Sequence, residues 1–323
     1  QVLMALMYDA IGQKGAAGET YLDIYNKVKS DSAVSYILAP TRRKSRVYSI
    51  ESQKLLKSTF LFKEYDDYTK ALFEIECLHA VKELIKGEQK FSVSDISIPI
   101  LDAKNNAYIS VIKRDRCKLL SDITKNLQPI FTDVLQYLAL IHAKLKVKGL
   151  NHVSLEEVIS RLKYSDELKA AFLSNKKPLE ESYLHVPDAY HKDSHPLNYG
   201  ISESGAVILF DGENRGIRPV TSDLAKLFLL HPLIKPDFII AALDKYANFY
   251  NIYSASPDKM HSLHLPFLNA SIEIAFAHPS RLLEDSEENK EIKIHLFRNA
   301  LHSINKIKNE FNGFYQKHAV AYD

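Results

Sequence analysis

The segment His191-Lys-Asp-Ser-His-Pro-Leu-Asn198 decides how the rest of this chain is interpreted. It places an Asp and an Asn five residues apart, with a proline between them that is typical of a loop. The apolar run Ala206-Val-Ile-Leu-Phe210 predicts a short strand further along, and Asp211 stands at the end of that strand. Loops at strand ends present polar groups to a cleft without disturbing a core. Taken alone, the eight residues would also suit a polar turn, so their meaning depends on their surroundings.

The polar side chains of these segments suit the transfer of a phosphoryl group to a hydroxyl group. That reaction needs a carboxylate to orient and deprotonate the hydroxyl, and oxygen ligands to hold Mg²⁺. Asp193 can supply the carboxylate, and Asn198 and Asp211 can hold the metal. A His-x-Asp-x4-Asn loop followed by a metal-binding Asp is also the order found in protein kinases.

Away from these segments, the chain changes from a strand-rich part to a helical part. Short strands are predicted at 36–38, 47–50, 59–63, 96–100 and 108–112, with a helix at 68–86. Further helices are predicted at 130–145, 155–174, 221–231, 236–252, 264–277 and 288–317, and strands at 199–201 and 206–210. The predicted fold class is α+β: a helical extension over 1–34, a small strand-rich N-lobe over 35–113 and a larger, mostly helical C-lobe over 114–323. A junction between two such lobes is a favoured place for a ligand cleft.

The composition is that of an ordinary globular protein and argues against several classes of partner. The 323 residues are 46% hydrophobic and carry a net charge of only +2, so no strong field points to nucleic acid or a membrane surface. The apolar run Val2–Met7 is far shorter than the roughly 20 residues of a membrane span. The two cysteines do not make a disulfide framework. We therefore expect a cytoplasmic protein that binds neither nucleic acid nor membrane, and the sequence predicts no oligomeric state.

Four segments in order resemble the aminoglycoside phosphotransferase and choline kinase family, the small-molecule branch of the protein-kinase-like fold. They are Leu138-Ala-Leu-Ile-His142-Ala, His191-x-Asp193-x4-Asn198, Asp211-Gly-Glu213-Asn-Arg-Gly216 and Asp223-Leu-Ala225. The resemblance implies a bilobal kinase in which Asp193 is the catalytic base and His191 supports it. It also implies ATP or GTP as phosphoryl donor and Mg²⁺ held by Asn198 and Asp211, with Glu213 assisting through water.

Three upstream segments, Phe62-Lys63, Phe73-Glu74 and Tyr108–Ile112, resemble the nucleotide-binding part of the same family. The resemblance assigns Lys63 to the α- and β-phosphates of the nucleotide and Glu74 to an ion pair with that lysine. The backbone near Val111 and Lys113 is expected to meet the nucleotide base.

The chain departs from the family pattern in three places. The loop Ala39-Pro-Thr-Arg-Arg-Lys-Ser-Arg46 has no glycine, although glycine lets backbone amides approach phosphates closely. Ser45 or the basic side chains of this loop are expected to contact phosphate instead. Gly212 follows Asp211 where an aromatic residue is usual, and Lys192 stands where glycine is frequent. None of these changes removes a residue with a direct chemical role.

Two alternatives to a small-molecule kinase remain open. A glycine-free phosphate loop could mark a pseudokinase or interaction module that binds nucleotide without turnover. His185, His191 and His195 could instead belong to a metallo-hydrolase in which a metal activates water, but that interpretation gives Asn198 and Lys63 no task. If the protein is a kinase, aminoglycosides, sugars, choline-like amines and protein hydroxyls are all candidate acceptors.

Overall fold

The computed structural model of the chain describes residues 14–30, 47–50, 58–96, 99–103, 106–115, 117–146, 151–162, 164–174, 186–190, 193–212, 216–231, 233–255, 260, 262–282 and 309. The chain divides into two compact units, unit 1 (Gln1–Cys117 with Ser202–Glu213) and unit 2 (Lys118–Ile201 with Asn214–Asp323). Among the described helices, none is long and apolar enough to cross a membrane.

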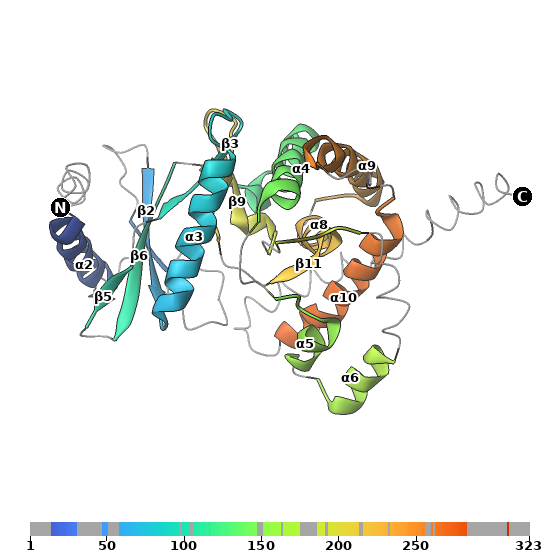
Figure 1. The fold of residues 1–323 in the computed structure, drawn as a ribbon, viewed down its shortest axis with the longest axis horizontal. Coiled ribbons are helices and arrows are strands. Elements are labelled where there is room, and N and C mark those ends of the chain that lie inside the picture. The colour runs from blue at the N-terminus through green and yellow to red at the C-terminus, as the bar shows by residue number, and fades with distance from the viewer. Residues whose placement is uncertain are drawn as a thin grey trace, which may run out of the picture. The chain divides into compact units, whose positions relative to one another are not determined.

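Unit 1 is built on an antiparallel sheet. Its strands are β1 (Val47–Ile50), β2 (Ser58–Tyr65), β6 (Ala107–Asp115), β4 (Asp95–Ile96) and β5 (Ile100–Asp102), in the order β1-β2-β6-β4 with β5 also paired to β6. Helices α2 (Lys14–Ser30) and α3 (Tyr68–Leu84) lie on opposite sides of this sheet (Figure 1). Because alternate side chains of a strand point to opposite faces, Phe62 packs with Tyr25 of α2, whereas Lys63 bonds to Glu74 of α3. The sheet therefore keeps an apolar core on its α2 face and directs Lys63 towards α3.

A pair of short parallel strands brings a distant segment into unit 1. β3 (Phe91–Val93) pairs with β10 (Val207–Leu209), and Phe91 lies opposite Val207. All the residues of β10 are buried, as its apolar sequence requires. Gly212, just after β10, lies against the side of α3. Pairing with β3 thus positions the polar residues that follow β10.

Unit 2 is mostly helical. Its described helices are α4 (Leu127–Lys144), α5 (Leu155–Ser160), α6 (Asp166–Leu173), α8 (Val220–Leu229), α9 (Pro236–Tyr253) and α10 (His264–Leu282), with the 3₁₀ turns η1 (Leu120–Asp122) and η2 (Pro196–Asn198). Its described strands are β7 (Cys117–Leu119), β8 (Asp188–Tyr190), β9 (Tyr199–Ser202) and β11 (Ile217–Pro219), of which β7 and β9 span the boundary between the units. Every residue of α8 is buried. The centroid of its Phe228 ring lies 5.9 Å from that of Phe131 in α4 and 6.0 Å from that of Phe267 in α10. Figure 1 shows the helices α4, α8 and α10 in unit 2. The core of this unit thus forms around α8.

Most of the predicted elements that fall on described residues are confirmed. The predictions at 47–50, 59–63, 68–86, 108–112, 199–201 and 206–210 correspond to β1, β2, α3, β6, β9 and β10. The prediction of one helix over 155–174 is wrong. The structure has α5 and α6 there, because Ser165 caps a new helix and accepts a hydrogen bond from the Leu168 amide at 3.3 Å. The single strand predicted at 96–100 is likewise replaced by the separate strands β4 and β5.

Some predictions lie outside the described residues. They are the strand at 36–38, the glycine-free loop at 39–46 and, apart from residue 309, the helix at 288–317. Within the predicted extension 1–34, the described helix α2 belongs to the core of unit 1. Its Tyr25 is fully buried and donates a hydrogen bond to Glu64 Oε2 at 2.8 Å.

Candidate active site

A buried ion pair joins β2 to α3 in unit 1. Lys63 Nζ donates to Glu74 Oε2 at 2.7 Å, and both side chains are buried. Burial raises the pKa of Glu74 above its usual value, although the Lys63 ammonium acts in the opposite direction. Because a buried charge is costly without a partner, each residue of this pair depends on the other. The structure thus brings together two residues that the sequence assigned to nucleotide binding.

Asp211 joins the same cluster from the end of β10. Its Oδ1 lies 3.4 Å from Lys63 Nζ, and its side chain is 30% exposed. One ammonium group therefore contacts both a deeply buried carboxylate and a carboxylate that solvent can reach. The second carboxylate is the one that the sequence assigned to a metal ion.

Tyr65 is a member of this cluster that the sequence analysis missed. Its hydroxyl donates to Glu74 Oε2 at 2.7 Å, the oxygen that also accepts from Lys63, and its ring centroid lies 5.4 Å from Lys63 Nζ. Burial raises the pKa of Tyr65 well above its usual value, which keeps the hydroxyl a donor. Tyr65 stands two residues after Lys63 on β2, so the period of a strand already placed both on one face.

Gly212 lets helix α3 approach the segment that carries Asp211. A Cβ atom at this position would lie 2.7 Å from Leu78 Cγ and 2.8 Å from the Glu74 carbonyl oxygen. Both distances are below normal van der Waals contact, and one of the atoms is fixed backbone. The glycine that departs from the family pattern is therefore required by the packing of α3.

Gly212→Ala is expected to lower the free energy of unfolding by about 1–3 kcal/mol, the usual cost of overpacking a core. The added methyl group would push against α3 at Glu74, so the nucleotide affinity predicted for Lys63 and Glu74 should fall as well. Denaturant unfolding of the purified chain measures the first effect. Gly18→Ala is the control. Gly18 lies in helix α2, and an added Cβ would be 3.7 Å from Ile100 Cγ1, which is an ordinary van der Waals contact. An unfolding free energy equal to that of wild type in Gly212→Ala would show that α3 can move aside without cost.

In unit 2, the loop that begins at Asp193 is held by its own hydrogen bonds. The Asp193 carbonyl oxygen accepts from the His195 amide at 2.6 Å and from Asn198 Nδ2 at 2.9 Å. Asp193 has φ of 55°, in the left-handed region that non-glycine residues seldom occupy. Backbone strain of this kind concentrates at functional sites. The two predicted residues Asp193 and Asn198 are thus brought together by the turn η2.

Helix α8 holds this loop through a hydrogen bond to its backbone. Asp223 Oδ1 accepts from the Ser194 amide at 2.9 Å, and its Oδ2 lies 3.1 Å from His142 Nε2. His142 Nδ1 in turn lies 2.6 Å from the Tyr246 hydroxyl of α9. Since all these groups are buried, each polar atom needs the partner that the next one provides. His142 and Asp223 therefore have a structural task, linking α4, α8 and α9 to the loop.

Lys226 is a second residue that the sequence analysis missed. It lies on α8 three positions after Asp223, and its Nζ is 2.5 Å from Asp193 Oδ1. The side chains of Lys226 and Asp193 are 10% and 19% exposed. The spacing of three places Lys226 and Asp223 on the same face of a helix, and that was the available signal.

The remaining predicted site residues are placed as follows. Val111 is buried in the α2 core of unit 1, and Lys113 is exposed on β6 between β2 and β4. Contact of their backbone with a nucleotide base stays a prediction. Ser45, His191 and Glu213 lie outside the described residues. Within the described part of the chain, no group of three or more His, Cys, Asp or Glu side chains could hold a metal ion.

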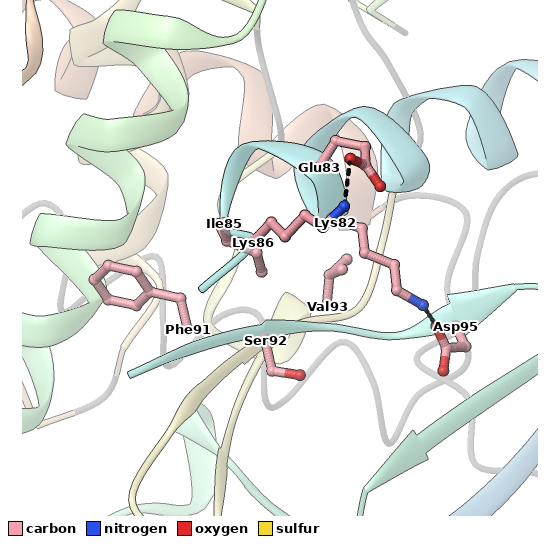
Figure 2. Close-up of a pocket in the computed structure, with 8 residues that line it drawn as sticks. All are labelled: Lys82, Glu83, Ile85, Lys86, Phe91, Ser92, Val93 and Asp95. Atoms are coloured by element: carbon pink, nitrogen blue, oxygen red, sulfur yellow. Dashed lines mark hydrogen bonds and ion pairs between the residues drawn. The ribbon is translucent and has the colours of Figure 1, made fainter. Parts of the chain in front are cut away.

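Figure 2 shows a pocket of about 320 Å³ in unit 1, between the end of α3 and β3. It is lined by Lys82, Glu83, Ile85, Lys86, Phe91, Ser92, Val93 and Asp95. Lys82 forms an ion pair with Asp95, and Lys86 forms one with Glu83. The charged residues that line the pocket therefore neutralise one another. None of these residues belongs to the predicted site.

Several solved structures have a fold similar to that of this chain. Choline kinase LicA from Streptococcus pneumoniae matches with a TM-score of 0.54 and 16% identity, over 89% of this chain and 99% of that chain. Amicoumacin kinase hAmiN matches with a TM-score of 0.57 and 13% identity, over 91% and 96%. Spectinomycin phosphotransferase matches with a TM-score of 0.53 and 10% identity, over 84% and 92%. No protein-family model and no curated protein sequence matches the chain. The chain therefore has the α+β, protein-kinase-like fold of these choline and amicoumacin kinases and of spectinomycin phosphotransferase.

Proposed function

We propose that the protein transfers the γ-phosphoryl group of ATP or GTP to a hydroxyl group of a small molecule, in a Mg²⁺-dependent reaction. The observation that carries the proposal is the contact of the buried Lys63 ammonium with both Glu74 and Asp211. A lysine held by a helix glutamate, together with a metal-binding Asp, is how protein kinases handle nucleotide phosphates.

The solved structures of similar fold support a nucleotide donor and a small acceptor. LicA is described with AMP, hAmiN with AMP-PNP and Ca²⁺, and spectinomycin phosphotransferase with ADP and spectinomycin. For this chain we propose that the N-lobe, 35–113, binds nucleotide and that the C-lobe, 114–323, supplies the catalytic loop and binds the acceptor. Lys63 would bind the α- and β-phosphates, and the backbone near Val111–Lys113 would meet the base.

We propose two oxygen donors as ligands of a Mg²⁺ ion. Asp211 has a carboxylate that solvent can reach. Asn198 uses its amide nitrogen in the bond to Asp193, which leaves its amide oxygen as a ligand atom. Hard oxygen atoms are the ligands that Mg²⁺ prefers, and the bound ion would neutralise the phosphate oxygens during transfer. Glu213 would assist through water.

Asp193 would act on the acceptor. Its carboxylate would accept a hydrogen bond from the acceptor hydroxyl, orient it towards the γ-phosphorus and take its proton. The bonds from Asn198 and Asp223 fix the peptide group between Asp193 and Ser194, next to this carboxylate. A fixed carboxylate is what such a step requires, because a misplacement of about 1 Å can cost roughly 10²-fold in rate.

Lys63→Met is expected to weaken binding of ATP with Mg²⁺ by about tenfold or more, which corresponds to about 1.4 kcal/mol. The methionine keeps most of the apolar stem but removes the ammonium that would contact phosphate. Isothermal titration of the full chain measures the dissociation constant. Lys86→Met is the matched control, because Lys86 follows α3, has a side chain that is 78% exposed and lies outside the predicted site. Equal affinity of wild type and Lys63→Met would contradict the proposed phosphate site.

Turnover separates the enzyme from the pseudokinase. Nucleoside diphosphate release would be measured with Mg²⁺ over a panel of aminoglycosides, sugars and choline-like alcohols. Release that depends on both Mg²⁺ and one of these acceptors is the expected result. Nucleotide binding without any release, with water or with any acceptor, would favour the pseudokinase instead.

A further inference from the structure

Lys226 is a buried cation to which the proposed reaction has given no task. Its Nζ contacts the carboxylate oxygen Oδ1 of Asp193 at 2.5 Å, and its side chain is 10% exposed. Burying a lysine is costly, and the cost is offset here by an ion pair with a catalytic-loop carboxylate. Since Asp223 on the same helix face already fixes the loop backbone at Ser194, Lys226 is not needed to anchor the loop.

The proposed role of Asp193 determines what lies near this ammonium during the reaction. An acceptor hydroxyl bound to Asp193 has its oxygen within about 2.6–3.2 Å of the carboxylate. In a reactive geometry that oxygen is about 3–3.5 Å from the phosphorus it attacks. Under the proposed function, an ammonium on the same carboxylate is therefore a neighbour of the phosphoryl group in transit. The flexible four-carbon stem of lysine can close the remaining distance.

We propose that Lys226 is a catalytic residue that binds the phosphoryl group while it is being transferred; this inference rests on the proposed function. The acceptor oxygen forms a bond to the γ-phosphorus. The bond from that phosphorus to the β,γ-bridging oxygen breaks, and its electron pair leaves with the nucleoside diphosphate. The acceptor proton passes to Asp193. Lys226 stays an ammonium throughout and stabilises the negative charge of the phosphoryl oxygens.

A purely structural role for Lys226 predicts a different behaviour. A cation that only holds Asp193 in place contributes equally before and during transfer, whereas a catalytic cation contributes more in the transition state. The two roles therefore separate in the affinity for a mimic of the phosphoryl group in transit. This comparison needs no knowledge of the natural acceptor.

The test compares binding of ADP with Mg²⁺, alone and with added aluminium fluoride, to the full chain. In wild type, aluminium fluoride should tighten ADP binding. In Lys226→Met, ADP should bind as in wild type, but the gain from aluminium fluoride should fall by about tenfold or more, or about 1.4 kcal/mol. Lys226→Arg, which keeps the charge, should recover part of the gain. Lys245→Met is the matched control, because Lys245 is exposed on α9, and it should leave the gain unchanged.

Other outcomes would contradict either the inference or the proposed function on which it rests. A gain of equal size in wild type and Lys226→Met, or no gain in wild type, would overturn it while the nucleotide site stands. Failure of wild type to bind ADP with Mg²⁺ would instead overturn the proposed function itself. If Lys226→Met does not fold, Lys226→Arg carries the test: a gain well above zero but below that of wild type supports the inference, and an unchanged gain contradicts it.

Discussion

Asp193→Asn is expected to lower the turnover number by about 10²–10⁴-fold, the usual contribution of a general base. The amide has nearly the same shape as the carboxylate but cannot take the acceptor proton. Asparagine tolerates the left-handed backbone better than other non-glycine residues, so the φ of 55° is no obstacle to folding. Nucleoside diphosphate release under saturating nucleotide, with the best acceptor of the panel or with water, measures the effect. Affinity for nucleotide should stay unchanged, because the proposed role of Asp193 is to act on the acceptor.

Asp166→Asn is the matched control for this variant. Asp166 lies in the first turn of α6, and its side chain is 99% exposed. It should leave turnover unaltered. Wild-type turnover in Asp193→Asn would refute the assignment of Asp193 as the base, whereas loss of nucleotide affinity would indicate that the loop had rearranged.

Asp211→Asn is expected to reduce turnover by at least about 10²-fold, since a catalytic metal supplies several kcal/mol of charge stabilisation. The neutral amide attracts a divalent cation far less than a carboxylate does. The Mg²⁺ concentration that gives half-maximal turnover should therefore rise. The substitution also removes one of the two carboxylates that contact Lys63. A Mg²⁺ titration of turnover, at fixed nucleotide, measures the shift.

Glu203→Gln is the control, because it removes a carboxylate from the exposed turn before β10. It should leave the Mg²⁺ titration unchanged. If Asp211→Asn required no more Mg²⁺ than wild type, the ion would have to be held elsewhere. The cluster around Lys63 would then be structural.

The sequence predicted much of the fold because local apolar patterns mark its helices and strands. The helix at 68–86 and the strands at 59–63 and 108–112 have strong apolar periods, and the structure has an element at each place. Pairings between distant segments could not be predicted in this way. The three-residue strand β3 is too short to show a period, and its partner β10 lies more than a hundred residues away.

The residues of the candidate site that belong to a sequence motif were predictable. Those that only contact a motif residue in the folded chain were not. Lys63, Glu74 and Asp211 were each expected, and the structure brings all three together. Tyr65 and Lys226 were missed, although both follow an assigned residue by one strand or helix period. The role of the Tyr65 hydroxyl or the Lys226 ammonium follows from the carboxylate that it contacts, and local sequence does not specify that contact.

The close packing of helix α3 against Gly212 affects how such a protein could be regulated. In many kinases, movement of the helix that carries the glutamate breaks the ion pair with the nucleotide lysine and stops catalysis. Here the same movement would also open a void beside Gly212, at the unfavourable free energy of any emptied core position. The packing thus opposes an inactive state of unit 1 reached through α3. Under the proposed function, the rate of phosphoryl transfer would then depend on the concentrations of nucleotide and acceptor and not on a movement of α3.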